Sequence, residues 1–145
     1  MTKKIFSFIV AALLLSVGTA CEKEKVISRN DLPKASLEFL AKHFPNLKVT
    51  FAAKDWDNYE VLLENGFEVN FRRNGEWDEV DGNRDAVPQS IVDLLPKTIA
   101  DYVATQFPNT RIVSVNREWF GYDIDLSNEL DLKFDTKGNI REIDN

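Results

Sequence analysis

The residues whose side chains could carry out chemistry are few, and they lack the partners that catalysis requires. His43 is the only histidine, and it follows Lys42 near the end of a helical pattern. A serine or cysteine nucleophile needs an adjacent base, yet the chain has no Gly-x-Ser-x-Gly elbow and its only cysteine, Cys21, precedes the folded part. We therefore interpret His43 as a solvent-exposed helix residue and predict no catalytic residue, no cofactor and no enzyme activity.

The acidic segment 123–129 resembles the beginning of a calcium-binding loop. An EF-hand loop requires Gly at its sixth position and Glu at its twelfth, where this chain has Asn128 and Phe134. Apolar residues alternate with the acids of this segment, which is typical of a strand with one buried face. A zinc site would need a second His or Cys ligand. We expect no metal site, and we expect Asp123 and Asp125 to lie on the exposed face of a strand.

The N-terminus has the pattern of an export signal. Lys3 and Lys4 precede an apolar run over residues 5–17, and three small residues follow at 18–20. A membrane-spanning helix needs about 20 apolar residues, so this run is too short to be one. We predict a signal peptide over residues 1–20 and an exported, periplasmic or outer-membrane-anchored protein.

Cys21 directly follows the small residues and is a candidate for lipidation. Its placement resembles a bacterial lipobox, in which the cysteine becomes the acylated first residue of a lipoprotein. Gly18 stands where that pattern usually has Leu, so the alternative is ordinary cleavage after Ala20 that leaves a free thiol. In either case residues 21–27 are expected to be a polar tether.

The net charge limits the classes of partner. The formal charge of −6 for the whole chain becomes −8 when Lys3 and Lys4 are removed with the signal peptide. Binding to phosphate groups depends on clustered Lys and Arg side chains. Nucleic acid is therefore not an expected partner, and membrane contact is expected only through a lipid anchor.

The folded part consists of two copies of one sequence pattern. A shift of 63 positions aligns residues 32–82 with 95–145 without a gap, and 15 of the aligned pairs are identical. Each copy begins with Leu-Pro and a helical apolar pattern, in which Asp31 is the expected cap of the first helix. Each helix is expected to end at Phe-Pro-Asn, and residues 87–94 to form a further short helix.

After each helix the apolar residues alternate with a period of two, and turn signals such as Glu64-Asn65-Gly66 separate the runs. Four strands with tight connections must be antiparallel. We predict an α+β fold in which two helix-plus-four-strand units, residues 28–84 and 85–145, form one antiparallel sheet of about eight strands with helices on one face.

The order Leu-Pro, helix, Phe-Pro-Asn, strand, Tyr-x-Val/Ile-x-Leu, turn, Phe and Gly resembles the PepSY-like family of bacterial periplasmic proteins and lipoproteins, which is also described as β-lactamase-inhibitor-like. The resemblance covers residues 28–145. It implies a fold similar to the β-lactamase inhibitor protein, a tandem repeat that presents its sheet to a partner. The wider group is similar to propeptide segments that restrain secreted peptidases. The resemblance supplies no inhibitory motif.

Five residues are our candidates for contact with a partner protein. Strand alternation places Leu62, Val113 and Val115 on the exposed sheet face, as an apolar patch rimmed by charge. Trp119 and Phe120 lie at a hairpin, where large aromatic side chains often anchor interfaces. Because Trp119 recurs as Trp56 in the other copy, packing against the core is the favoured alternative for the two tryptophans.

These features favour a non-enzymatic binding module of the cell envelope. Such a module would hold a protein or peptide, as an inhibitor of a peptidase or other hydrolase does, on its open sheet face. The alternative is a structural or stress-related envelope lipoprotein with no tight partner. We expect the binding surface where the two copies disagree, namely at Phe120 versus Asp57, Val113 and Val115 versus Thr50 and Ala52, and Asp123 and Asp125 versus Glu60 and Leu62.

Overall fold

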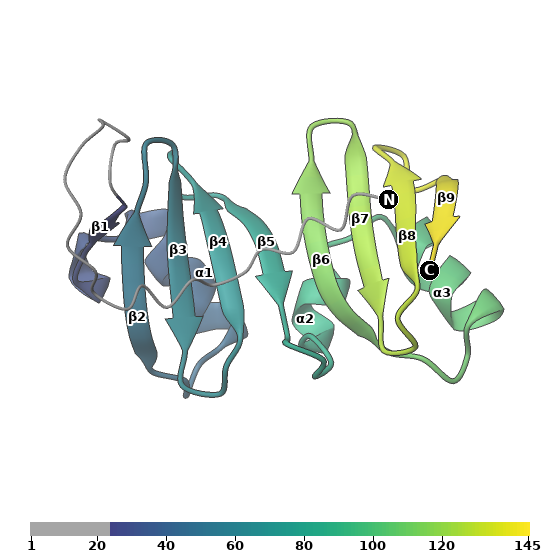
Figure 1. The fold of residues 1–145 in the computed structure, drawn as a ribbon, viewed down its shortest axis with the longest axis horizontal. Coiled ribbons are helices and arrows are strands. Elements are labelled where there is room, and N and C mark those ends of the chain that lie inside the picture. The colour runs from purple at the N-terminus through teal and green to yellow at the C-terminus, as the bar shows by residue number, and fades with distance from the viewer. Residues whose placement is uncertain (1–23) are drawn as a thin grey trace, which may run out of the picture.

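The computed structural model describes residues 24–145, which form one antiparallel sheet of nine strands and three α-helices. The sheet is a meander in which strands consecutive in sequence are also neighbours in space (Figure 1). The strands are β1 (Lys25–Val26), β2 (Val49–Lys54), β3 (Asn58–Leu63), β4 (Glu68–Arg72), β5 (Trp77–Asp81), β6 (Ile112–Glu118), β7 (Gly121–Leu126), β8 (Asp131–Asp135) and β9 (Ile140–Asp144). The helices are α1 (Lys34–His43), α2 (Gln89–Val92) and α3 (Lys97–Gln106), with a short 3-10 helix, η1 (Arg29–Asp31). The predicted signal peptide and Cys21 lie outside the described residues.

The single antiparallel sheet agrees with the prediction, but the number of strands does not. Lys25 and Val26, which we expected in a polar tether, form β1 and pair with Lys54 and Ala53 of β2. A strand of two residues is too short to show alternation, so the sequence pattern could not reveal it. All three helices lie on one side of the sheet, behind it in Figure 1, and no helix of residues 24–145 lies on the other face, which we call the open face.

The start of each long helix packs against a glycine turn of the sheet. A β-carbon added at Gly75 would lie 2.7 Å from Cβ of Pro33, and one added at Gly138 would lie 3.0 Å from Cβ of Pro96. Both glycines have a positive φ, which other residues adopt at a cost. The recurring Leu-Pro and Gly motifs are therefore one contact made twice.

The expected cap of α1 is wrong. Pro33 occupies the N-cap position, and its side chain makes no capping hydrogen bond. Asp31 instead accepts a hydrogen bond from the backbone N–H of Ser28, at 3.0 Å, in a capping box that closes η1. The 3-10 turn uses the polar side chain that the sequence pattern had assigned to the longer helix.

The hydrophobic core lies between the sheet and the helices. Phe71 of β4 and Phe134 of β8 are almost completely buried. The ring of Phe39, on α1, meets Phe71 edge-on at 5.6 Å, and Tyr102, on α3, meets Phe134 in the same way at 5.6 Å. Each long helix is thus fixed to its own set of strands by an aromatic contact.

Register shifts in β2 and β6 reverse which side chains face the helices. In β6, Ile112 pairs with Leu126 but Ser114 pairs with Asp125, so the strand gains one residue at Val113. Such a bulge moves every later side chain to the opposite face. Val115 is consequently 0% exposed and Val113 8% exposed. Our assignment of both valines to the exposed face is wrong.

The same shift in β2 brings an unexpected aromatic residue to the open face. Val49 pairs with Leu63, whereas Phe51 pairs with Leu62. Phe51 and Leu62 therefore lie side by side on the face away from the helices, and both are partly exposed. Leu62 lies on the open face as predicted, but its apolar neighbour is Phe51 rather than the two valines.

His43 is also placed differently from the prediction. Its side chain is only 7% exposed, and its ring packs 4.5 Å from that of Phe39. Nδ1 of His43 lies 2.8 Å from Oγ of Ser90, in α2, so the two share a hydrogen bond. Burial, with a contribution from the charge of Lys42, lowers the pKa of His43. This histidine joins α1 to α2 and is not a solvent-exposed helix residue.

Candidate interaction surface

The open face of the sheet carries two rows of side chains that cross the strands. Strand pairing gives the first row as Glu60, Asn70, Glu79, Asn116, Asp123, Lys133 and Glu142. It gives the second row as Phe51, Leu62, Glu68, Asp81, Ser114, Asp125, Asp131 and Asp144. Paired strands are about 4.8 Å apart, so the carboxylates in each row are close neighbours. We call these two rows the acidic face.

Burial, together with crowding, raises the pKa of several carboxylates on the acidic face. Partial burial, together with repulsion from Asp81, raises the pKa of Glu68 to about 7. Burial raises the pKa of Glu79 to about 7 as well, against the opposing effect of a hydrogen bond from Asn70. Desolvation and the nearby Asp131 raise the pKa of Asp125 to about 6. The centre of the acidic face therefore holds negative charge at an energetic cost.

Lys133 is the cation that neutralises the outer part of the acidic face. Its Nζ lies 3.0 Å from Oε2 of Glu142 and 2.7 Å from Oδ2 of Asp144. These two contacts raise the pKa of Lys133 and stabilise its charged form. Within residues 24–145 no ion pair reaches Glu68, Glu79 or Asp81. The negative charge of the acidic face is therefore least compensated at β4 and β5.

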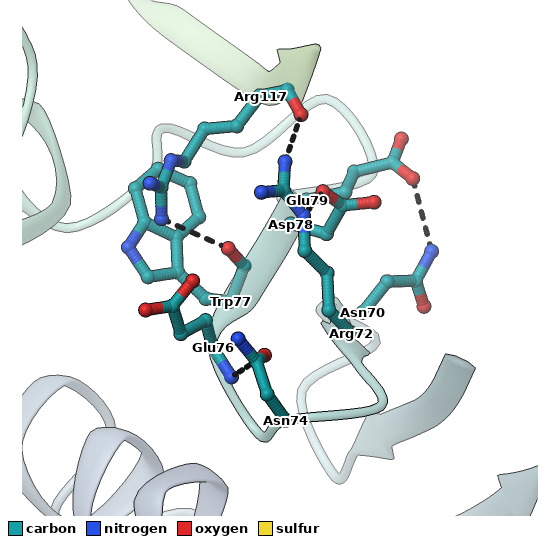
Figure 2. A network of polar contacts seen from close by, with 8 residues as sticks. All are labelled: Asn70, Arg72, Asn74, Glu76, Trp77, Asp78, Glu79 and Arg117. Atoms are coloured by element: carbon teal, nitrogen blue, oxygen red, sulfur yellow. Dashed lines mark hydrogen bonds and ion pairs between the residues drawn. The ribbon is translucent and has the colours of Figure 1, made fainter. Parts of the chain in front are cut away.

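A polar network beside the acidic face joins β4, β5 and β6 (Figure 2). Nε of Arg72 contacts Oδ1 of Asp78 at 2.7 Å, and Nη2 of Arg72 donates to the backbone oxygen of Arg117 at 2.8 Å. Arg117 in turn donates to the backbone oxygen of Trp77 at 3.0 Å, and its guanidinium lies 4.7 Å from the centre of the Trp77 ring. Arg72 is thus paired with Asp78, and neither arginine forms an ion pair with a carboxylate of the acidic face among the described residues.

The hairpin turns expose large aromatic side chains at one end of the sheet. Trp119 is 86% exposed, Phe120 is 49% exposed, and the two rings meet edge-on at 5.2 Å. Trp56, in the β2–β3 turn, is 68% exposed. Packing of the two tryptophans against the core, which their recurrence favoured, is therefore wrong. Trp119 also lines a shallow groove between the two halves, with Asn58 and other polar residues.

In residues 24–145 no three His, Cys, Asp or Glu side chains converge in a way that could hold a metal ion. Asp123 and Asp125 belong to β7 and lie on the open face, as the sequence predicted. No helix in this part of the chain is long and apolar enough to cross a bilayer.

Comparison with known proteins identifies a family. A family model described as "Putative beta-lactamase-inhibitor-like, PepSY-like" matches residues 18–65 and, a second time, residues 57–142. The chain belongs to the PepSY-like family. The resemblance read from the sequence motifs is therefore confirmed, and both halves of this PepSY-like chain carry the match. Comparison with curated proteins gives no match.

Three solved structures of similar proteins come from Bacteroides species. A protein from Bacteroides thetaiotaomicron, described as "a putative calcium-regulated periplasmic protein", is 36% identical, with a TM-score of 0.78 over 84% of this PepSY-like chain and 97% of its own. A Bacteroides vulgatus protein described as "a putative periplasmic protein" is 35% identical, with a TM-score of 0.79 over 87% and 100% of the two chains. A second one, "of unknown function", is 30% identical, with a TM-score of 0.78 over 85% and 100%.

These PepSY-like relatives are described as periplasmic proteins, and none of the three descriptions names an enzyme. That agrees with the expected compartment. The acidic face could be predicted only in part from the sequence, because alternation alone assigned side chains of β2 and β6 to the wrong faces of the sheet. The sequence does contain one sign of a bulge in β6. Two consecutive apolar residues, Ile112 and Val113, interrupt the alternation before Ser114 and Val115.

Proposed function

We propose that this chain is a non-enzymatic binding module of the periplasm that holds a positively charged protein or peptide on its acidic face. The observation that carries the proposal is the concentration of uncompensated carboxylates at β4 and β5, where burial and repulsion raise the pKa of Glu68 and Glu79 to about 7. A cation from a partner would remove that repulsion on binding. Charge complementarity of this kind steers association and selects partners.

The exposed hairpin supplies the apolar part of the proposed interface. Trp119 and Phe120 form the turn of the β6–β7 hairpin and are exposed. A partner that lies on the acidic face and extends beyond the end of β6 would contact them. Aromatic side chains of this size contribute strongly once a partner excludes water from them. Phe51 and Leu62 offer a second, smaller apolar contact on the face itself.

The test is a titration with decalysine, a simple basic peptide, at low ionic strength. One variant removes three charges from the acidic face, through Glu68→Gln, Glu79→Gln and Asp81→Asn. The matched control removes three charges from the helix side, through Glu38→Gln, Asp93→Asn and Asp101→Asn. We expect the first variant to lose at least about tenfold in affinity and the control to lose far less. Equal losses would mean that only net charge attracts the peptide, and the proposed surface would be wrong.

Calcium is the second candidate ligand, because the relative that is 36% identical is described as calcium-regulated. Calcium prefers six to eight oxygen ligands, and carboxylates are abundant on the acidic face. The described residues hold no preformed metal site, so calcium would have to draw neighbouring side chains together. Calorimetric titration with calcium chloride tests this candidate, and heat that disappears in the Glu68→Gln, Glu79→Gln, Asp81→Asn variant would support it.

We also propose that the mature protein is tethered by a lipid on Cys21. The lipobox-like placement of this cysteine after three small residues supports the proposal. Mass spectrometry of the mature N-terminus is the direct measurement. A diacylglycerol adduct on Cys21 is expected, and an unmodified cysteine at the first position would contradict the anchor.

A further inference from the structure

Two groups of four residues occupy corresponding places on the acidic face, 63 positions apart in sequence. The central quartet, in β4 and β5, consists of Glu68, Asn70, Glu79 and Asp81. The edge quartet, in β8 and β9, consists of Asp131, Lys133, Glu142 and Asp144. In each quartet the first residue pairs with the fourth across the two strands, and the second pairs with the third. The two quartets therefore share one geometry, and they differ in charge only because Asn70 stands where the other has Lys133.

The edge quartet shows which ligand this geometry accepts. The ammonium of Lys133 bridges one carboxylate from each row of the acidic face, Glu142 at 3.0 Å and Asp144 at 2.7 Å. Its side chain is one-third exposed, so the bridge lies at the surface of the sheet. An alkyl-ammonium group of this kind fits between the carboxylates of β9 without any metal ion.

The central quartet has the corresponding carboxylates but no ammonium. Asn70 donates a single hydrogen bond, from Nδ2 to Oε2 of Glu79 at 2.9 Å (Figure 2), and its amide carries no charge. Oδ1 of Asn70 is shielded from solvent and has no hydrogen-bond partner in the described part of the chain. Rotation of the amide would offer that oxygen to an incoming N–H group.

We infer that the central quartet binds one lysine or arginine side chain of the partner. The cation of that side chain would lie beside Asn70, in the position that the ammonium of Lys133 has in the edge quartet. This inference rests on the proposed function and adds where the partner's cation lies. Charge complementarity supports it, because three carboxylates meet here with no ion pair among the described residues. Asp125, two strands away across Ser114, adds to the negative potential at this place.

The substitution Asn70→Lys tests the inference by supplying the missing ammonium from within the chain. The built-in lysine is expected to bridge Glu79 and Asp81 as Lys133 bridges its own pair, and to lower affinity for decalysine at least about tenfold. The control is Thr105→Lys, which makes the same change of charge on exposed α3, on the other side of the sheet. We expect the control to change affinity less than about twofold, since a distant surface charge is screened.

The reverse substitution gives an independent gain of binding. Lys133→Asn turns the edge quartet into a copy of the central one, so a second decalysine-binding place should appear and the stoichiometry should rise. Circular dichroism and urea unfolding of both variants show whether the sheet remains intact. A folded Lys133→Asn protein with unchanged stoichiometry and affinity would contradict the inference.

The outcomes separate this inference from the proposed function. If removing three charges from the acidic face abolishes binding while Asn70→Lys does not, the acidic face binds the peptide but the central quartet is not the receptor. If neither change matters, both proposals fail. If calcium chloride binds to the wild type and not to Asn70→Lys, and decalysine binding is unaffected, the occupant is a metal ion and the inference is overturned.

Discussion

Arg72, in β4, donates a hydrogen bond of 2.8 Å to the backbone oxygen of Arg117, in β6, and so reaches across the whole of β5. Arg117 returns across the same junction to the backbone oxygen of Trp77. Only three residue pairs connect β5 to β6, so these side-chain bonds supplement a short ladder at the middle of the sheet. The junction that they close lies beside the central quartet, because Glu79 and Asp81 belong to β5 and pair with residues of β6.

Loss of Arg117 should weaken this junction. Arg117→Ala removes a charged hydrogen bond and the contact with the Trp77 ring, and we expect the free energy of unfolding to fall by about 1–3 kcal/mol. Urea unfolding followed by circular dichroism measures it. Arg111→Ala is the control, because Arg111 is exposed and forms no ion pair with any residue of 24–145. Equal stability of the two variants would show that the junction does not depend on Arg117.

Substitutions at two glycine turns separate backbone strain from steric contact. Gly75 and Gly66 have nearly the same φ, +86° and +87°, but only at Gly75 would a β-carbon meet Pro33 at 2.7 Å. Gly66→Ala should cost about 1 kcal/mol from strain alone. Gly75→Ala should cost about 2–4 kcal/mol, because the start of α1 must also move. Thermal unfolding of both variants decides this, and similar losses would contradict the contact between helix and turn.

Stability should fall as pH rises from about 4.5 to about 7. Glu68 and Glu79 have pKa values of about 7 in the folded chain and 4.5 when unperturbed. Because their folded pKa values are raised, the folded state binds more protons in this window, and the contribution is lost as pH rises through the folded pKa. The measurement is the urea midpoint as a function of pH.

Glu79→Gln isolates the effect of one carboxyl group. We expect this variant to unfold at higher urea concentration than the wild type above pH 7, by on the order of 1 kcal/mol, with a flatter pH profile. The lowered pKa of His43 makes stability rise with pH below about pH 6.5, which opposes the effect of the two glutamates. This contribution is the same in the wild type and in Glu79→Gln. Glu38→Gln, on the exposed face of α1, is the control. A Glu79→Gln profile parallel to that of the wild type would contradict the raised pKa.

The bulge in β6 can be tested by core truncation. Val115 is 0% exposed whereas Val26 is 66% exposed, although both are valines in strands. Val115→Ala should lower the free energy of unfolding by about 2 kcal/mol, and Val26→Ala by far less. Chemical unfolding of the two variants provides the comparison. If Val115→Ala left the free energy of unfolding unchanged, Val115 would lie on the exposed face, as simple alternation predicts.

Most of the fold follows from the sequence because its signals are local. The Leu-Pro starts, the Phe-Pro-Asn ends and the glycine turns each act through nearby backbone geometry, and they locate the long helices and the hairpins. The two-residue β1 gave no such signal. His43 lies buried because α2, distant in sequence, covers it with Ser90, and a helical pattern read alone cannot include that neighbour.

The candidate surface was harder to predict because it depends on register. A bulge of one residue in β6 moved Val115 into the core, left Val113 buried and brought Ser114 beside Asp125. The difference between Asn70 and Lys133 was visible in the alignment of the two copies. Its meaning was not, since the strand pairing that places Glu79 and Asp81 beside Asn70 had to be known first.

Nuclear magnetic resonance tests the central claim most directly. Backbone amide shifts of the isotope-labelled protein are followed during titration with decalysine. We predict that the largest shifts lie in β4 to β7, around Asn70, Glu79 and Ser114, and that they vanish when salt screens the charges. Shifts concentrated in α1 and α3, or a response spread evenly over the surface, would contradict a binding site on the acidic face.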